Sequence, residues 1–200
     1  MRYLLIYILI LLASACNNQQ RNIAVAADSS AVAITITQTT LLETDSGFKV
    51  KSNLYYHNDS LYSGFIEGYS PAHKLISRFG FWKGQKQGIQ QQWYENGQLK
   101  ETRYYLANMK TGTHTGWWDN GVKRFEYVFD KDIPIKRHCQ WYKSGKLCSL
   151  FEYNNAGQPE GAQQLWYEDG TVKSNYVVKD NRRFGFLGAK GCVMNASVKR

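Results

Sequence analysis

The side chains best suited to covalent chemistry are four cysteines, at positions 16, 139, 148 and 192. A thiol can be acylated, oxidised to a disulfide or bound to a metal. Cys139 and Cys148 flank one expected turn, where Cys139 faces Leu150 and Cys148 faces Trp141 across the hairpin. They are therefore diagonal neighbours, and a bridge between them requires a register shift or a bulge. A Cys139–Cys148 disulfide and two separate buried thiols both stay open.

The other polar residues lack the spacing of a catalytic or metal site. The histidines, at positions 57, 73, 114 and 138, form no His-Glu-x-x-His or other close ligand cluster. The sequence contains neither a phosphate-binding Gly-x4-Gly-Lys-Ser/Thr loop nor a Gly-x-Ser-x-Gly elbow. Its carboxylates scatter over expected strand ends and turns, so the enzymatic alternative is a distant glycosidase-type pair. We predict a protein that is not an enzyme and that has no cofactor and no metal.

The N-terminus has the layout of an export signal. Met1 and Arg2 precede an apolar run over residues 3–12, about half of the roughly 20 residues that span a bilayer core. Small residues at 13–15 lead to Cys16, and Leu-Ala-Ser-Ala-Cys at 12–16 resembles the lipobox of bacterial lipoproteins. In that family the cysteine is acylated and becomes the first residue of the mature chain. The resemblance implies a lipoprotein signal peptide at 1–15 and lipidation of Cys16, for example by palmitate.

Residues 16–46 are expected to hold the lipidated cysteine and a flexible tether. Asn, Gln, Ala, Ser and Thr dominate this segment, and it contains no aromatic residue. Asn17 is not the Asp that retains lipoproteins of enteric bacteria at the inner membrane. The expected location is therefore the cell envelope, lipid-anchored, at the outer rather than the inner membrane. Which side of that membrane the protein faces stays open.

A repeat of about 24 residues governs the rest of the chain. Trp-Tyr-x-x-Gly or a close variant begins at Trp93, Trp117, Trp141 and Trp166, at intervals of 24, 24 and 25 residues. Extending the period towards the N-terminus reaches Tyr69. Glycines follow the same period, five residues before and four after the leading aromatic, and are predicted as repeat turn glycines: Gly64, Gly88, Gly97, Gly112, Gly121, Gly145, Gly161, Gly170 and Gly185. Lys136 replaces one of them, so a differently built turn is expected there.

Each repeat is expected to be a β-hairpin. Residues 90–94 and 99–105 are predicted strands around Asn96-Gly97, a turn dipeptide in which both residues tolerate positive φ. Such units predict an all-β fold: a tandem β-hairpin repeat array forming an elongated, twisted single-layer antiparallel meander. We place the repeats at residues 47–188, with residues 47–61 capping one end and residues 189–200 as a C-terminal tail or cap.

The leading aromatics define a repeat aromatic ladder: Tyr69, Trp93, Trp117, Trp141 and Trp166. Successive strand residues point to opposite faces, so a sheet without covering helices must bury apolar area between neighbouring repeats. Stacking of these large side chains from repeat to repeat is the structural interpretation. A platform on which a ligand stacks is the functional alternative.

The unit Gly-x4-Trp-Tyr-x-x-Gly-x-Leu-Lys resembles the MORN repeat, and most closely the bacterial variant found in YwqK-type, antitoxin-like proteins. Residues 88–101 carry the pattern best, residues 161–173 come next, and the resemblance extends over residues 64–185. It implies a β-hairpin array without catalysis that contacts proteins or phospholipids.

The net charge of the repeat region limits the classes of partner that we expect. From residue 48 onwards there are 23 Lys and Arg against 13 Asp and Glu, a net charge of +10. A basic array held at a membrane is drawn to anionic surfaces, whereas export argues against nucleic acid. The expected contact residues are lysines near turns: Lys83, Lys86, Lys110, Lys143 and Lys146.

We therefore expect a non-catalytic, lipid-anchored envelope protein that serves as a binding scaffold. Its partner would be a protein, an anionic lipid or a cell-wall polymer. An antitoxin-like neutraliser of a partner protein is the first alternative, and an envelope enzyme acting on polymer is the second. The oligomeric state and the identity of the partner stay open.

Overall fold

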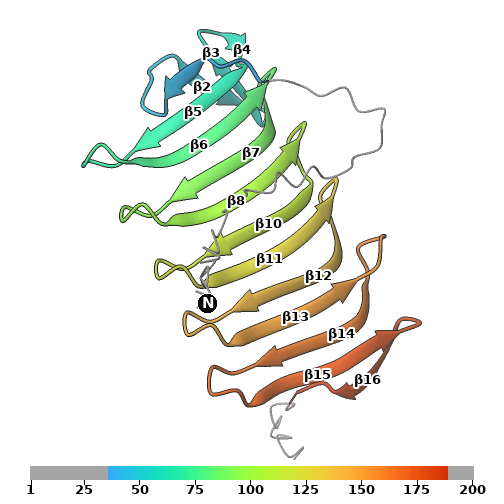
Figure 1. Ribbon diagram of the computed structural model, residues 1–200. Helices are drawn as coiled ribbons and strands as arrows, with labels where there is room; N and C mark the ends of the chain where they lie inside the picture. The colour runs from blue at the N-terminus through green and yellow to red at the C-terminus, as the bar shows by residue number, and fades with distance from the viewer. Residues whose placement is uncertain (1–35, 189–200) are drawn as a thin grey trace, which may run out of the picture. The chain divides into compact units, whose positions relative to one another are not determined.

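The computed structural model describes residues 36–188 (Figure 1). Predictions that fall outside this range are the signal peptide, the lipidation of Cys16, the tether up to residue 35 and the tail at 189–200. Cys192 lies in that tail.

The described residues form sixteen strands and no helix. They are β1 (Thr40–Leu42), β2 (Phe48–Lys51), β3 (Leu54–His57), β4 (Ser60–Leu61), β5 (Gly64–Tyr69), β6 (Leu75–Trp82), β7 (Gln85–Trp93), β8 (Leu99–Leu106), β9 (Met109–Lys110), β10 (Gly112–Trp117), β11 (Lys123–Asp130), β12 (Ile133–Trp141), β13 (Leu147–Tyr153), β14 (Pro159–Trp166), β15 (Val172–Lys179) and β16 (Arg182–Phe186).

One sheet of 13 strands holds most of them. From β5 to β16 each strand pairs with its sequence neighbours in antiparallel fashion, with short β9 attached to β8. Only β1, which pairs with β5, runs parallel to its neighbour. Figure 1 shows the hairpins following one another along the sheet in chain order. The predicted all-β array of tandem hairpins is confirmed.

Five hairpins, from β5–β6 to β14–β15, have their closing turns on the same side of the sheet, where the strands end. We call this side the tryptophan edge; it contains Tyr69, Trp93, Trp117, Trp141 and Trp166 and the turns that follow them. In the second of these repeats, Gly97 N donates to Tyr94 O at 2.9 Å, and Tyr94 N donates to Gln98 O at 2.9 Å. Gly97 has a φ of 84°, whereas Asn96 keeps a negative φ. This is a type I turn followed by a left-handed glycine, so the expected turn with positive φ at both Asn96 and Gly97 is wrong. The same pattern recurs with Gly121, Gly145 and Gly170, and with His73 in the first repeat.

The opposite edge uses tight two-residue turns with positive φ at both positions, as at Ala107 (49°) and Asn108 (68°). The connection from β13 to β14 is the exception. Tyr153 pairs with Pro159, which leaves five residues between them, whereas four separate Tyr105 from Lys110. This one additional residue accounts for the single 25-residue interval in the sequence.

The second series of glycines lies within strands rather than in turns. Gly88 sits inside β7, with a φ of 68°, where the register against β6 shifts between Phe79 and Phe81. The prediction that these glycines lie in turns is therefore wrong, although all five have the positive φ that glycine favours: Gly64, Gly88, Gly112, Gly161 and Gly185. Lys136 adopts the same conformation, with a φ of 61°. The expected difference in backbone at Lys136 is absent, and this lysine occupies a region that favours glycine.

The N-terminal end of the repeats is covered by the small sheet β2–β3–β4. Tyr62, Ile66 and Phe81 form a buried cluster, against which Phe48 and Tyr55 pack. The folded part also begins before the predicted boundary at residue 46. Residues 40–42 form β1 because the edge of β5 offers free backbone groups for pairing.

Candidate functional site

The tryptophan edge is bonded from each repeat to the next. In three successive repeats the second aromatic donates to the carbonyl of the next leading tryptophan: Tyr94 Oη to Trp117 O at 3.0 Å, Trp118 Nε1 to Trp141 O at 3.0 Å, and Tyr142 Oη to Trp166 O at 2.9 Å. Each bond satisfies a backbone acceptor that lies at the end of a strand. The second residue of the Trp-Tyr motif therefore holds neighbouring hairpins at a fixed spacing.

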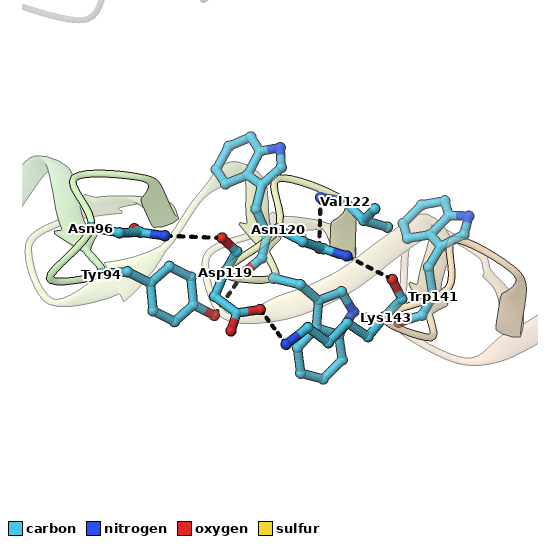
Figure 2. Close-up of polar contacts among 9 residues, drawn as sticks. Tyr94, Asn96, Asp119, Asn120, Val122, Trp141 and Lys143 are labelled. Carbon is cyan, nitrogen blue, oxygen red and sulfur yellow. Dashed lines mark hydrogen bonds and ion pairs between the residues drawn. The ribbon is translucent and has the colours of Figure 1, made fainter.

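A second set of bonds links the turns themselves. Asn96 Nδ2 donates to Asp119 O at 3.1 Å, and Asn120 Nδ2 donates to Lys143 O at 3.0 Å, as Figure 2 shows. Where the repeat lacks this asparagine, a lysine two positions further on replaces it: Lys74 Nζ donates to Glu95 O at 2.9 Å and Lys146 Nζ to Glu168 O at 3.0 Å. Four turns are therefore each bonded to a backbone carbonyl of the next turn, either by an asparagine or by a lysine side chain.

The lysines expected to contact a partner lie in different environments. Lys143 Nζ is 2.6 Å from Asp119 Oδ1, and this bond holds the pKa of the Asp119 carboxyl below its usual value. Lys143 and Lys146 therefore contribute to contacts between repeats. The others lie near aromatic rings, with Nζ-to-centroid distances of 5.8 Å for Lys83 and Trp82, 5.4 Å for Lys86 and Tyr105, and 5.2 Å for Lys110 and Phe129.

Cations also cover the second aromatic of the motif. The cation lies six residues after the ring: Lys100 over Tyr94 at 5.7 Å, Arg124 over Trp118 at 5.5 Å, and Lys173 over Tyr167 at 5.5 Å. Such contacts are worth about 0.5–1 kcal/mol at exposed sites. Cys148 stands at this position in the fourth repeat. The second, third and fifth repeats therefore each present a ring covered by a positive charge at this edge.

The leading aromatics do not form the expected stack. Trp93, Trp117, Trp141 and Trp166 are half-buried, and Tyr69 is exposed. No close pair of aromatic rings among residues 36–188 involves a tryptophan. Stacking along the ladder is therefore wrong, because the register shifts just before each leading aromatic. The ligand platform stays a hypothesis.

A different set of rings forms a series of tilted and edge-to-face contacts through the interior. Two histidines alternate with three aromatics, with centroid distances of 5.6 Å for Tyr105–His114, 5.0 Å for His114–Phe129, 5.2 Å for Phe129–His138 and 4.9 Å for His138–Tyr153. These pairs are worth about 0.5–1.5 kcal/mol each beyond the area that they bury. They tie the β8, β10, β11, β12 and β13 strands together.

The histidines belong to a buried column that sequence reasoning missed. Its members lie three residues before each leading aromatic: Ile66, Gln90, His114, His138 and Gln163. Each polar member binds a carbonyl on the preceding strand: Gln90 that of Gly80 at 2.9 Å, His114 that of Tyr104 at 2.9 Å, His138 that of Val128 at 2.8 Å and Gln163 that of Glu152 at 2.7 Å. These side chains add hydrogen bonds between neighbouring strands near the bulges, where the pairing is irregular. The residue types differ, so only their constant spacing could have revealed the column.

His114 and His138 are structural residues. Burial lowers the pKa of both imidazoles below the ordinary value. Each ring Nε2 faces a carbonyl oxygen, so it carries the proton and donates. At neutral pH both rings are therefore uncharged members of the core.

The thiols of Cys139 and Cys148 are separate. Cys139 pairs with Leu150 as expected, but Trp141 pairs with Leu147, so Cys148 lies in the bulge beside it. The possible disulfide between Cys139 and Cys148 is therefore not formed. Burial raises the pKa of the Cys139 thiol, which disfavours its reactive thiolate form.

Among residues 36–188, no group of three or more His, Cys, Asp or Glu side chains is placed to hold a metal ion. In the same range, no helix has the length and apolar character needed to cross a membrane.

One repeat of this array matches a known family. The MORN repeat variant matches residues 86–107, which run from β7 through the tryptophan edge to the end of β8. MORN repeats are generally interaction or binding modules and generally lack catalysis. No curated protein matches this chain. The matched segment is one hairpin of five that share their turns and their register, so the chain is an all-β array of hairpins similar to the MORN repeat variant.

Proposed function

We propose that this protein is a non-catalytic, lipid-anchored envelope protein whose repeat array is a binding scaffold for a protein, an anionic lipid or a cell-wall polymer. One observation supports the role as a scaffold: side-chain hydrogen bonds join each hairpin to the next along the tryptophan edge. A sheet fixed in this way loses little conformational entropy when it binds an extended partner. The MORN repeat match at residues 86–107 supports the same class of function.

The charge supports an anionic partner. The chain has a formal net charge of +9. Three repeats place a cation over a ring at the tryptophan edge, an arrangement that suits acidic groups and sugars or peptides that stack on rings.

Lipid anchoring rests on the sequence at residues 12–16. Acyl chains contribute about 0.8 kcal/mol per buried CH₂, so two or three of them on Cys16 would hold the array at the membrane. The test is metabolic labelling with a palmitate analogue, comparing the wild-type protein with Cys16→Ala. We expect label and membrane sedimentation for the wild type and neither for Cys16→Ala. Equal labelling of both proteins, or no labelling of either, would contradict the anchor.

The scaffold is tested separately by capture from envelope extracts. The bait is the full chain, and the matched variant is Lys100→Glu with Lys173→Glu, which reverses the charge at two cation–ring contacts of the edge. We expect a partner whose recovery falls at least fivefold with the variant and with added salt. Recovery of one protein in a one-to-one complex would favour the antitoxin-like alternative. Cleavage of a cell-wall polymer by the purified chain would contradict the non-catalytic assignment.

A further inference from the structure

The second repeat differs from its neighbours in what fills its interior. In every other hairpin, the residue paired with the buried column carries a ring: Phe79, Tyr127, Phe151 and Tyr176. In the second repeat Gln90 pairs with Arg103 instead. Two residues before Arg103 stands Glu101, also buried, where three other repeats have serine and one has phenylalanine. The aromatic interior is therefore interrupted at one place by three polar or charged groups.

A cavity of about 230 Å³ lies at this interruption. We call it the second-repeat pocket. Phe79 and Tyr105 contribute rings to its wall, and Gln90, Glu101, Arg103 and Lys86 contribute polar groups. Its volume lies below the range of about 300–1,000 Å³ that is usual for sites of drug-sized ligands. It is suited to one small acid or to one side chain of a larger partner.

The charges of the pocket are unbalanced. Glu101 accepts two bonds from Arg103, at 3.0 Å each, and Arg124 lies 3.6 Å away. Lys86 makes no ion pair within residues 36–188. Burial and the positive charge of Arg103 lower the pKa of the Lys86 ammonium. Two cations, Lys86 and Arg103, against one carboxylate, Glu101, leave the lining of the pocket net positive, so it favours an anion.

Gln90 supplies an independent observation. It is 4 % exposed, and its Nε2 donates to Gly80 O at 2.9 Å and to Gln87 O at 3.1 Å. Those two bonds orient the amide, and Oε1 is buried without a partner. A buried acceptor without a partner costs about 1–3 kcal/mol. A ligand that brings a hydrogen-bond donor beside its anionic group would satisfy this atom.

We propose that the second-repeat pocket binds a carboxylate that has a hydrogen-bond donor close to it. Lys86 Nζ and Arg103 Nη1, the guanidinium nitrogen that does not bond to Glu101, would donate to the carboxylate. Gln90 Oε1 would accept a hydrogen bond from the donor of the ligand. The rings of Phe79 and Tyr105 would flank the carbon atoms. Glu101 disfavours a dianion such as phosphate, because its own charge lies in the wall. The carboxylate could belong to a small free acid or to an acidic side chain of a bound protein.

The test is an NMR titration of the full-length protein at pH 7 and fixed ionic strength. The probe is N-acetylglycine, which has a carboxylate next to an N–H, and its control is N-acetylglycinamide, which lacks the charge. Lys86→Met is the variant. Lys110→Met is the matched control, because Lys110 occupies the equivalent position one repeat later and lies over Phe129.

We expect N-acetylglycine to bind the wild type and Lys110→Met with equal affinity, and Lys86→Met at least fivefold more weakly. Capped Gly-Glu-Gly and Gly-Gln-Gly peptides distinguish the two sources of the carboxylate. Tighter binding of the glutamate peptide than of the free acid assigns the site to an acidic side chain, and the reverse order assigns it to a small acid. Equal binding of N-acetylglycinamide, equal loss in both lysine variants, or tighter binding of inorganic phosphate would overturn the proposal.

Discussion

The second and third repeats share one hairpin geometry but fill their interiors differently. In the third, His114 pairs with Tyr127 and packs, tilted, between the rings of Tyr105 and Phe129. In the second, Gln90 pairs with Arg103 beside a cavity. Both Gln90 and His114 bind the equivalent carbonyl of the preceding strand. The hydrogen bond at the bulge is therefore common to both repeats. The residue opposite the column differs: a ring at this position fills the interior, which we call a packed repeat, and Arg103 leaves a cavity, which we call an open repeat.

The largest expected effect comes from removing the ring at the packed site. His114 is 1 % exposed, so His114→Ala leaves a cavity and removes one of the two hydrogen bonds to the Tyr104 carbonyl, the other coming from Thr111 N. We expect a loss of about 3–5 kcal/mol in the free energy of unfolding, measured by urea denaturation. Gln90→Ala, which removes hydrogen bonds but no packed ring, should cost about 1–3 kcal/mol. Equal losses would remove the distinction between packed and open repeats.

Acid should weaken the packed repeats selectively. The pKa values of His114 and His138 are lowered in the folded protein, so the unfolded chain binds more protons as pH falls. Their contribution is complete above about pH 6.5 and is lost as pH falls from that value through the lower folded pKa values. Urea midpoints between pH 7.5 and 5 measure this loss. In a variant with His114→Gln and His138→Gln, which copies the column of the second and fifth repeats, the slope should flatten.

The bonds along the tryptophan edge should contribute less. Tyr94→Phe removes the bond from the hydroxyl to Trp117 O and keeps the ring. We expect a loss of about 0.5–1.5 kcal/mol in the free energy of unfolding. Tyr104→Phe is the control, because Tyr104 is exposed and its hydroxyl has no hydrogen bond to residues 36–188. If both variants unfold at the same urea concentration, the bond between repeats is not stabilising.

The smallest effect should have the opposite sign. Lys136 is exposed and has a φ of 61°, so Lys136→Gly relieves backbone strain without removing packing. We expect a gain of about 1 kcal/mol. Arg137→Gly, at the next position with negative φ, should instead destabilise, because glycine weakens a strand interior and the ion pair between Arg137 and Glu152 is lost. A loss of stability in Lys136→Gly would show that the lysine side chain matters more than its backbone.

Much of this architecture follows from the sequence alone. The 24-residue spacing of Trp93, Trp117 and Trp141 predicted the hairpins and their number, because turn glycines recur at fixed distances from them. The interior was not predictable in the same way. A bulge beside each leading aromatic changes which side chains face the core, and alternation cannot reveal a bulge.

The second-repeat pocket was hidden for a related reason. Gln90, His114 and Gln163 share a column but no residue type, and their common role is a hydrogen bond to a distant carbonyl. Arg103 belongs to no motif in the sequence, and its pairing with Gln90 places it opposite the column. These residues are identified by the pairing register of their strands in the structure and not by a sequence motif.

One variant tests most directly the claim that the second repeat is a modified copy of a common hairpin. Glu101→Ser combined with Arg103→Tyr restores the residue types found at these positions in the first, fourth and fifth repeats, namely serine and a ring. Thermal unfolding and N-acetylglycine affinity should be measured on the same sample. We predict cooperative unfolding at or above the wild-type temperature and at least tenfold weaker binding. A protein that no longer unfolds cooperatively, or one that binds N-acetylglycine as the wild type does, would contradict this account.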